Sequence, residues 1–225
     1  MRIRKKYEEE LEDLVKQVVG LGHVVKDRFE ESIEALTNHD KETADYIGKA
    51  DDDIDDQYME IEKICSDLLA LQQPVASDLR LITASFKIVT DLERIGDLVV
   101  NITDYTLEID KPPLLDEESI LELASFAETM LIDSLEAYQE EDLEAARELA
   151  GRDEEMDQMC EAATRHLLQH LMEWEGQSFK EEAESLGQHV MIELLAIRDL
   201  ERVADHAVNI AARTVYMIST KRDLL

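Results

Sequence analysis

Glycine and proline are scarce in this chain, which has 7 glycines and 3 prolines among 225 residues. Average proteins contain roughly 12% of the two together. Folds built of many short strands need frequent turns, and glycine and proline supply them. Aromatic residues, at 5%, are also few. The composition therefore disfavours an all-β fold and favours long helices.

Cysteines and long apolar runs are equally sparse. Cys65 and Cys160 are the only cysteines, which is too few for a disulfide framework, and their spacing fits no zinc motif. The longest uncharged run, 68–77, contains Pro74 and is far shorter than the ~20 residues that span a bilayer. The basic start leads into an acidic stretch, not into an apolar signal segment. We expect a cytoplasmic protein without membrane insertion, reaching a membrane only through partners.

Positive charge is the next deficit, with 23 Lys and Arg against 54 Asp and Glu and a net charge of −31. Such a surface repels phosphate backbones, so nucleic acid is not an expected partner. The apolar share of 44% is too high for a disordered acidic chain. Excess acid suits solubility in a salty cytoplasm, docking to basic partners or cation binding, and composition does not choose among them.

Helical patterns fill the chain between its few turn signals. They predict six long helices, at 7–37, 41–71, 74–109, 117–139, 142–173 and 178–220. Residues recur every three or four positions from Leu81 to Thr106 and from His189 to Thr214, the spacing of a helix packed into a bundle. The fold class is therefore all-α, with two tandem three-helix bundles at 1–110 and 115–225 joined by a proline-containing linker at 111–114.

The two halves are repeats of each other. Segment 91–102 matches segment 199–210 at eight of twelve positions, 108 residues apart. Segment 32–55 matches 134–157 at eight of 24 positions, 102 residues apart. The repeat predicts that the two bundles are related by a pseudo-twofold axis.

Acidic residues recur in pairs four positions apart at matching places in both repeats. On a helix such residues stack on one face, where two like charges repel, and a divalent or trivalent cation would relieve that repulsion. In an acid-rich chain such pairs also arise by chance, and they lie opposite the apolar stripe, where charge is ordinarily solvated. Duplication also copies residues regardless of function. The candidate metal ligands are Asp51, Asp55, Glu93, Asp97, Asp153, Asp157, Glu201 and Asp205.

Five further residues are candidate accessory groups. Arg94 and Arg202 each follow a candidate Glu, and a pair of this kind on an exposed face is usually an ordinary ion pair. Asn101 and Asn209 lie one turn beyond the candidate acids, and His206 is adjacent to Asp205. No His follows a Glu by three positions, so the ferritin-type di-iron motif is absent.

The motifs Glu-Arg-Ile-Gly-Asp and Glu-Arg-Val-Ala-Asp, each followed by Asn-Ile, resemble those of the PhoU family. The opening Arg-Lys-Lys-Tyr-Glu-Glu-Glu-Leu-Glu-Asp-Leu and the segment Pro74-Val75-Ala76-Ser77-Asp78-Leu79-Arg80 are also similar to that family, and the similarity covers essentially the whole chain. The resemblance implies surface clusters of iron or zinc on the candidate acids, and their oxygen ligands also suit manganese or magnesium. One departure is that 185–188, Ser-Leu-Gly-Gln, stands where the first repeat has the Asp-Leu-Arg segment.

The resemblance further implies a homodimeric regulator, not an enzyme, that restrains the phosphate ABC transporter when phosphate is plentiful. The expected partners are the ATPase subunit of that transporter and, where present, a membrane sensor kinase. Two alternatives stay open: a metal-binding helical protein with a redox or storage role, and a regulator of a different transporter. A salt-adapted source would account for the acidity without any partner.

Overall fold

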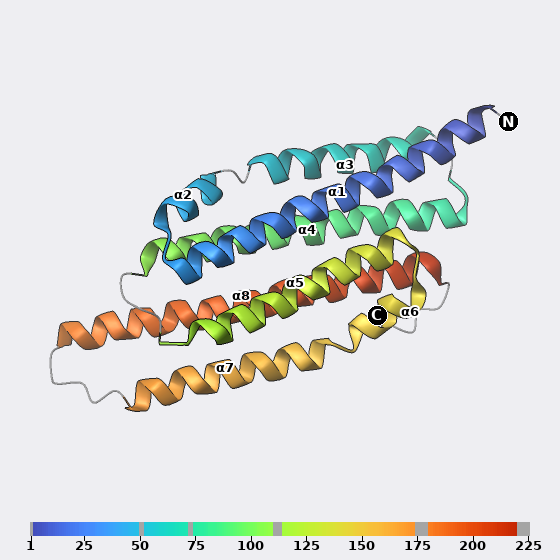
Figure 1. Ribbon diagram of the computed structural model, residues 1–225. Helices are drawn as coiled ribbons and strands as arrows, with labels where there is room; N and C mark the ends of the chain where they lie inside the picture. The colour runs from blue at the N-terminus through green and yellow to red at the C-terminus, as the bar shows by residue number, and fades with distance from the viewer. Residues whose placement is uncertain (1, 50–51, 72–73, 110–113, 174–179, 220–225) are drawn as a thin grey trace.

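A computed structural model describes residues 2–49, 52–71, 74–109, 114–173 and 180–219 of the chain. These residues form helices and no strand, and no helix among them is long and apolar enough to cross a membrane. The helices, shown in Figure 1, are α1 (Arg2–Asn38), α2 (Lys41–Lys49), α3 (Asp52–Leu71), α4 (Ala76–Glu108), α5 (Glu117–Gln139), α6 (Leu143–Ala150), α7 (Asp153–Glu173) and α8 (Lys180–Ile218).

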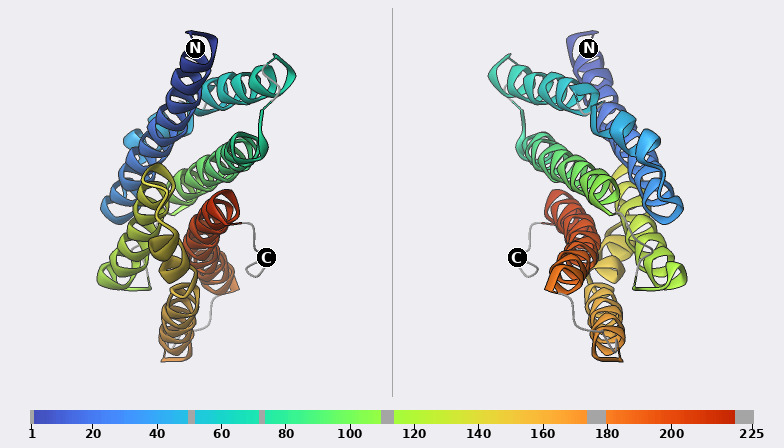
Figure 2. Two further views of the ribbon diagram at one scale, coloured as in Figure 1. Left: turned by 90° about the vertical axis from the view of Figure 1, so that its right-hand side faces the viewer. Right: turned by 90° about the vertical axis from the view of Figure 1, so that its left-hand side faces the viewer.

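The long helices are arranged as two connected bundles. In the first half α1, α3 and α4 pack on one another, and in the second half α5, α7 and α8 do. The halves meet where α4 lies along α8 and α1 lies along α5. Seen from the ends in Figure 2, α3 and α7 therefore occupy opposite extremes of the molecule. The prediction of an all-helical fold with three helical arms in each half is confirmed.

The second arm of the second half differs from its prediction, because it is divided into a short helix and a long one. In the first half, residues 50–51 between α2 and α3 lie outside the described residues. In the second half α6 ends at Ala150 and α7 begins at Asp153. Between them Gly151 donates its N–H to the Glu148 carbonyl at 3.0 Å, and Arg152 donates to Leu149 at 3.0 Å. These bonds span three residues, the tighter turn that commonly closes a helix. The single helix predicted over 142–173 is therefore wrong at this point.

The turn that precedes the second arm is built identically in both halves. Asp40 and Asp142 cap the following helices, and each accepts two backbone N–H groups at 3.0 to 3.1 Å. The residues before them, His39 and Glu141, both take the left-handed conformation, with φ of 54° and 51°. A left-handed residue after a helix end is a common way to stop that helix. The sequence repeat at an offset of 102 residues thus corresponds to a turn that is repeated in the structure.

The apolar stripes predicted on the third and sixth arms form the core. Every stripe residue from Ser85 to Thr106 and from His189 to Thr214 is buried, and only Leu81, at the start, is partly exposed. On α1, buried residues also recur at intervals of three and four. Burial of such stripes is the main source of helix stability in a bundle.

The close approach of α1 to α5 generates a stability prediction. A Cβ at Gly22 would lie 2.5 Å from Leu135 Cδ1, whereas a Cβ at Gly20 would meet nothing within 4 Å. We expect Gly22→Ala to destabilise the fold by ~1–3 kcal/mol through overpacking. Gly20→Ala, the matched control, should stabilise it by ~0.5–1 kcal/mol through helix propensity. Urea denaturation measures both, and a Gly22→Ala protein as stable as Gly20→Ala would contradict the close packing.

Candidate functional site

The four candidate acids of the second half lie on two adjacent helices. Asp153 and Asp157 are in the first two turns of α7, and Glu201 and Asp205 are on α8, against which α7 packs. The break before α7 places Asp153 at a helix start, where the partial positive charge of the backbone favours a carboxylate.

Burial and mutual repulsion act on this group together. Partial burial raises the pKa of Asp153, and the charge of Asp157 raises it further. Burial likewise raises the pKa of Glu201, followed by the charges of Asp157, Asp205 and Asp153. Asp205 is an exposed residue, and partial desolvation and the charge of Asp153 raise its pKa against a lowering contribution from His206. The four carboxylates are thus close enough to disfavour one another's charge.

The charges of these carboxylates also act on the thiol of the neighbouring Cys160. Its thiol is buried, and burial together with the charges of Glu201, Asp157 and Asp205 raises its pKa to about 12. The thiol is therefore protonated at neutral pH, so it is neither a nucleophile nor a ready metal ligand.

In the first half, only part of the corresponding group of acids lies within the described residues. Asp51 lies outside the described residues. Asp55 on α3 and Asp97 on α4 are exposed, and Glu93 is partly buried beside Tyr58, whose pKa its charge helps to raise. In Tyr58 the largest contribution comes from a hydrogen bond to Glu62, with Tyr58 Oη and Glu62 Oε1 2.5 Å apart.

The carboxylates do not converge on a single point. Within the ranges that the structure describes, no three His, Cys, Asp or Glu side chains are grouped as a metal ion would require. The oxygen donors and their mutual repulsion match the chemistry of hard cations, but their side chains would have to rotate toward one another. Metal binding at the eight predicted ligands therefore stays a prediction.

Three of the five accessory residues have partners at the interface between the halves. Asn101 on α4 donates to Asp199 Oδ2 on α8 at 3.2 Å, and Arg202 Nη1 lies 3.5 Å from Asp199 Oδ1. His206 Nδ1 lies 3.0 Å from Asp91 Oδ1 and is largely buried. Of the other two, Arg94 is exposed on α4 and Asn209 is half-buried on α8.

Asp199 is the most enclosed charged group of this interface, with its side chain 0% exposed. Tyr105 donates its hydroxyl to Asp199 Oδ2 at 2.8 Å, and Arg198 donates to Oδ1 at 2.8 Å and 3.1 Å. Burial and this hydrogen bond raise the pKa of Tyr105, which keeps its hydroxyl protonated as the donor. A buried carboxylate is tolerated only when it is surrounded by donors in this way.

Asp91 is the repeat counterpart of Asp199, 108 residues earlier, and it occupies the equivalent position on α4. Its carboxylate faces His206 and, at 4.0 Å, the guanidinium of Arg213 on α8. Arg213 is itself the counterpart of Tyr105, so the two buried aspartates are related by the pseudo-twofold axis of the duplication. Sequence reasoning missed both as functional residues, although their identity in the two repeats was visible.

A third buried carboxylate, Glu193, fixes the chain where it enters the second half. Glu193 accepts the backbone N–H groups of Leu114 and Leu115, both at 2.7 Å, and lies 3.1 Å from His189 Nε2. His170 Nδ1 lies 2.7 Å from the Leu114 carbonyl oxygen. Burial raises the pKa of Glu193 despite these donors. His189 and Glu193, which are polar members of the buried stripe on α8, thus help to anchor the connection between the halves.

Comparison with known proteins points to one family. The model of the PhoU domain matches residues 18–106 and again 120–214. A phosphate-specific transport system accessory protein PhoU homolog from Clostridium acetobutylicum is 34% identical over 221 residues, 97% of each chain. A homolog of the same name from Synechocystis is 33% identical, covering 98% of this chain and 94% of its own.

Solved structures give the same result. The crystal structure of the phosphate transport system regulatory protein PhoU from Streptococcus pneumoniae superposes with a TM-score of 0.86 at 30% identity, covering 97% of this chain and 99% of its own. PhoU from Pseudomonas aeruginosa superposes with a TM-score of 0.84 at 29% identity, covering 94% and 98%. The similarity spans both halves and the interface between them.

The interface predicts an ordered pair of stability losses. Tyr105→Phe removes one donor from Asp199 and should lower the free energy of unfolding by about 1 kcal/mol. Asp199→Ala leaves all the donors of this carboxylate without their acceptor and should lower it by about 3 kcal/mol. Tyr216→Phe, at an exposed position of α8, is the matched control and should be neutral. Chemical denaturation measures all three, and equal losses for Asp199→Ala and Tyr216→Phe would show that the interface does not depend on this carboxylate.

Proposed function

We propose that this chain, which belongs to the PhoU family, is an accessory protein that restrains phosphate uptake by protein contact with the phosphate ABC transporter. The relatives' names place them in phosphate-specific transport systems. The single observation that carries the proposal is the match of the PhoU domain to both halves. On this proposal the chain acts on the cytoplasmic side, as a homodimer, and contacts the ATPase subunit and a sensor kinase where one is present.

The structure supports a binding role in preference to catalysis of acyl or thiol chemistry by its cysteines. Burial raises the pKa of both Cys65 and Cys160 to about 12. The buried carboxylates among the described residues, Asp91, Asp199 and Glu193, are engaged by groups of the chain itself. What is left facing outward is an acidic surface, which suits a basic partner surface.

The transport role is tested by deletion in the native host. Loss of the chain should raise phosphate uptake and expression of the transporter in phosphate-rich medium, because the restraint is removed. Uptake of radiolabelled phosphate and transporter transcript levels are the measurements, with the wild-type gene restored in trans as the control. Normal phosphate control in the deletion strain would favour a regulator of a different transporter instead.

We further propose that the second-half acids bind a hard cation, since cation binding relieves the repulsion within the group. This second proposal, of cation binding, does not depend on the transport role. A protein that bound metal and turned over substrate, without a transport partner, would fit the redox or storage alternative.

Metal binding is tested by elemental analysis after incubation with Fe²⁺, Zn²⁺ or Mn²⁺ and desalting. Glu201→Gln with Asp205→Asn should lose the bound metal, while Glu154→Gln with Glu161→Gln, exposed acids of α7 outside the group, should keep it. Equal metal content in the two variants would contradict the site. Because burial and neighbouring acids raise the pKa of Glu201 and Asp205, protons compete with the metal, and binding should weaken as pH falls, starting at a higher pH than for ordinary carboxylates.

The raised pKa values of Glu201 and Asp205 also predict a change in stability that can be measured without metal. An acid whose folded-state pKa is raised binds its proton more tightly when folded, so stability falls as pH rises through that pKa. The Glu201→Gln, Asp205→Asn protein should therefore be more stable than wild type at neutral pH. The difference should shrink below about pH 4, where the unfolded chain is protonated as well.

A further inference from the structure

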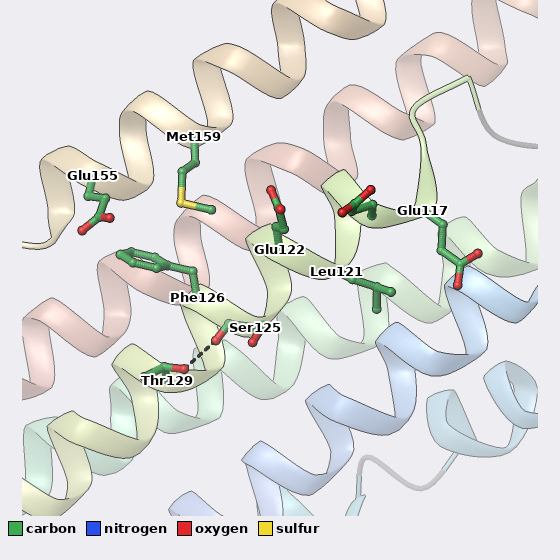
Figure 3. Close-up of a pocket in the computed structure, with 9 residues that line it drawn as sticks. Glu117, Leu121, Glu122, Ser125, Phe126, Thr129, Glu155 and Met159 are labelled. Carbon is green, nitrogen blue, oxygen red and sulfur yellow. Dashed lines mark hydrogen bonds between the residues drawn. The ribbon is translucent and has the colours of Figure 1, made fainter.

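A groove of about 850 Å³ lies between α5 and α7, outside the acid group and the interface. Leu121 and Phe126 of α5 and Met159 of α7 form its apolar part, and Phe126 and Met159 point toward each other across it in Figure 3. Leu121 is 41% exposed. The groove is thus an apolar surface left uncovered by the chain's own packing.

Two polar contacts between residues of α5, or its N-cap, and residues at or near α7 lie beyond the two ends of the groove. At one end Arg152 Nη1 lies 2.5 Å from Asp133 on α5, and its guanidinium stacks 4.8 Å from the Phe126 ring. At the other end His166 of α7 lies 3.3 Å from Asp116. The intervening stretch of α5 is about 25 Å long at 1.5 Å per residue, the length of a helix of four to five turns.

The rim of the groove is acidic, and the described residues that line the groove include no basic one. It is formed by Glu117, Glu118 and Glu122 of α5 and Glu155 of α7, all exposed. None of them takes part in the ion pairs found among the described residues. An apolar floor with an uncompensated acidic rim is complementary to an amphipathic segment that carries Lys or Arg.

The first half lacks this combination. The buried residues Val18, Leu21 and Val25 of α1 correspond to Ile120, Leu123 and Ala127 of α5, each 102 residues later.

With that register the counterparts of Glu117, Glu118 and Glu122 are Val15, Lys16 and Gly20. The three rim acids of α5 are therefore no by-product of the duplication, and the framework of the fold is built without them, whereas Glu155 of α7 corresponds to another acid, Asp53.

We propose that this groove binds a basic amphipathic helix of a partner protein, which completes a four-helix bundle with α5, α7 and α8. Its apolar side would cover Leu121, Phe126 and Met159, and its Lys or Arg residues would face the glutamates of the rim. A helix is the fitting occupant, since the groove runs between two helices and the described residues offer no strand edge. The proposal rests on the proposed function in one respect: the helix belongs to the transport-system partner.

Binding is tested first with a synthetic probe and the full-length protein. The probe is a labelled 18-residue peptide of about five turns with leucines on one face and lysines on the other. A peptide of the same composition, scrambled to destroy the apolar face, is its control. Fluorescence anisotropy should show binding of the amphipathic peptide at least about tenfold tighter than of the scrambled one, weakening with salt. Equal affinities would overturn the proposal.

Matched variants locate the site. Glu122→Lys with Glu155→Lys should weaken peptide binding about tenfold or more, while Glu136→Lys with Glu154→Lys, exposed glutamates of the same two helices outside the groove, should weaken it far less. Met159→Gln should also weaken binding, and Met172→Gln, 85% exposed on α7, should not. Equal effects of the two charge variants would mean that only net charge attracts the peptide, and would overturn the groove.

The last arm separates this proposal from the proposed function. The Glu122→Lys, Glu155→Lys protein, expressed in the deletion strain, should fail to restore control of phosphate uptake while Glu136→Lys, Glu154→Lys restores it. Full restoration by both would overturn the link between groove and transporter and leave the proposed function standing. If the groove variants instead abolish self-association measured by light scattering, the occupant is a second copy of this chain and the proposal is wrong.

Discussion

Two buried aspartates, one on each of the duplicated helices α4 and α8, determine how the halves of this protein fit together. A carboxylate without donors is too costly to bury. Arg198 of the same helix donates to Asp199 Oδ1, and Tyr105 and Asn101 of the opposite helix donate to Asp199 Oδ2. A shift of one helical turn, ~5.4 Å, would separate these groups. The register of α4 on α8 is therefore set by polar contacts, while apolar burial supplies the attraction.

Further polar contacts fix the chain outside this interface. Glu193 and His170 secure the connection between the halves, and Arg80 donates to the Met217 carbonyl at the last turn of α8, at 3.0 Å. The C-terminal end of a helix is a favourable place for a cation. The bond therefore gives the unduplicated Asp-Leu-Arg segment a structural role. With the interior closed by such contacts, any partner or cation has to bind at the exposed faces of the helices.

Much of the fold followed from periodicity, because a buried helix face must repeat every three to four residues whatever it packs against. The same logic predicted the stripe from Ser85 to Thr106. The break before Asp153 was missed, since Gly151 marks a helix end there while Gly20 and Gly22 lie within a helix, and only packing distinguishes them. The buried Asp199 was missed for a related reason: an acid's burial depends on the second helix, which no single helical pattern contains.

The two repeats agree where the fold needs them to and differ where the surface is free to. Ser32 and Ser134 are both fully buried, and each donates to the carbonyl three residues earlier at 2.7 Å. At the groove, by contrast, Gly20 in one half corresponds to Glu122 in the other. A symmetric framework with one asymmetric groove offers one helix-binding site per chain instead of two. The pseudo-twofold axis thus accounts for stability, and departures from it are where specific recognition has room to arise.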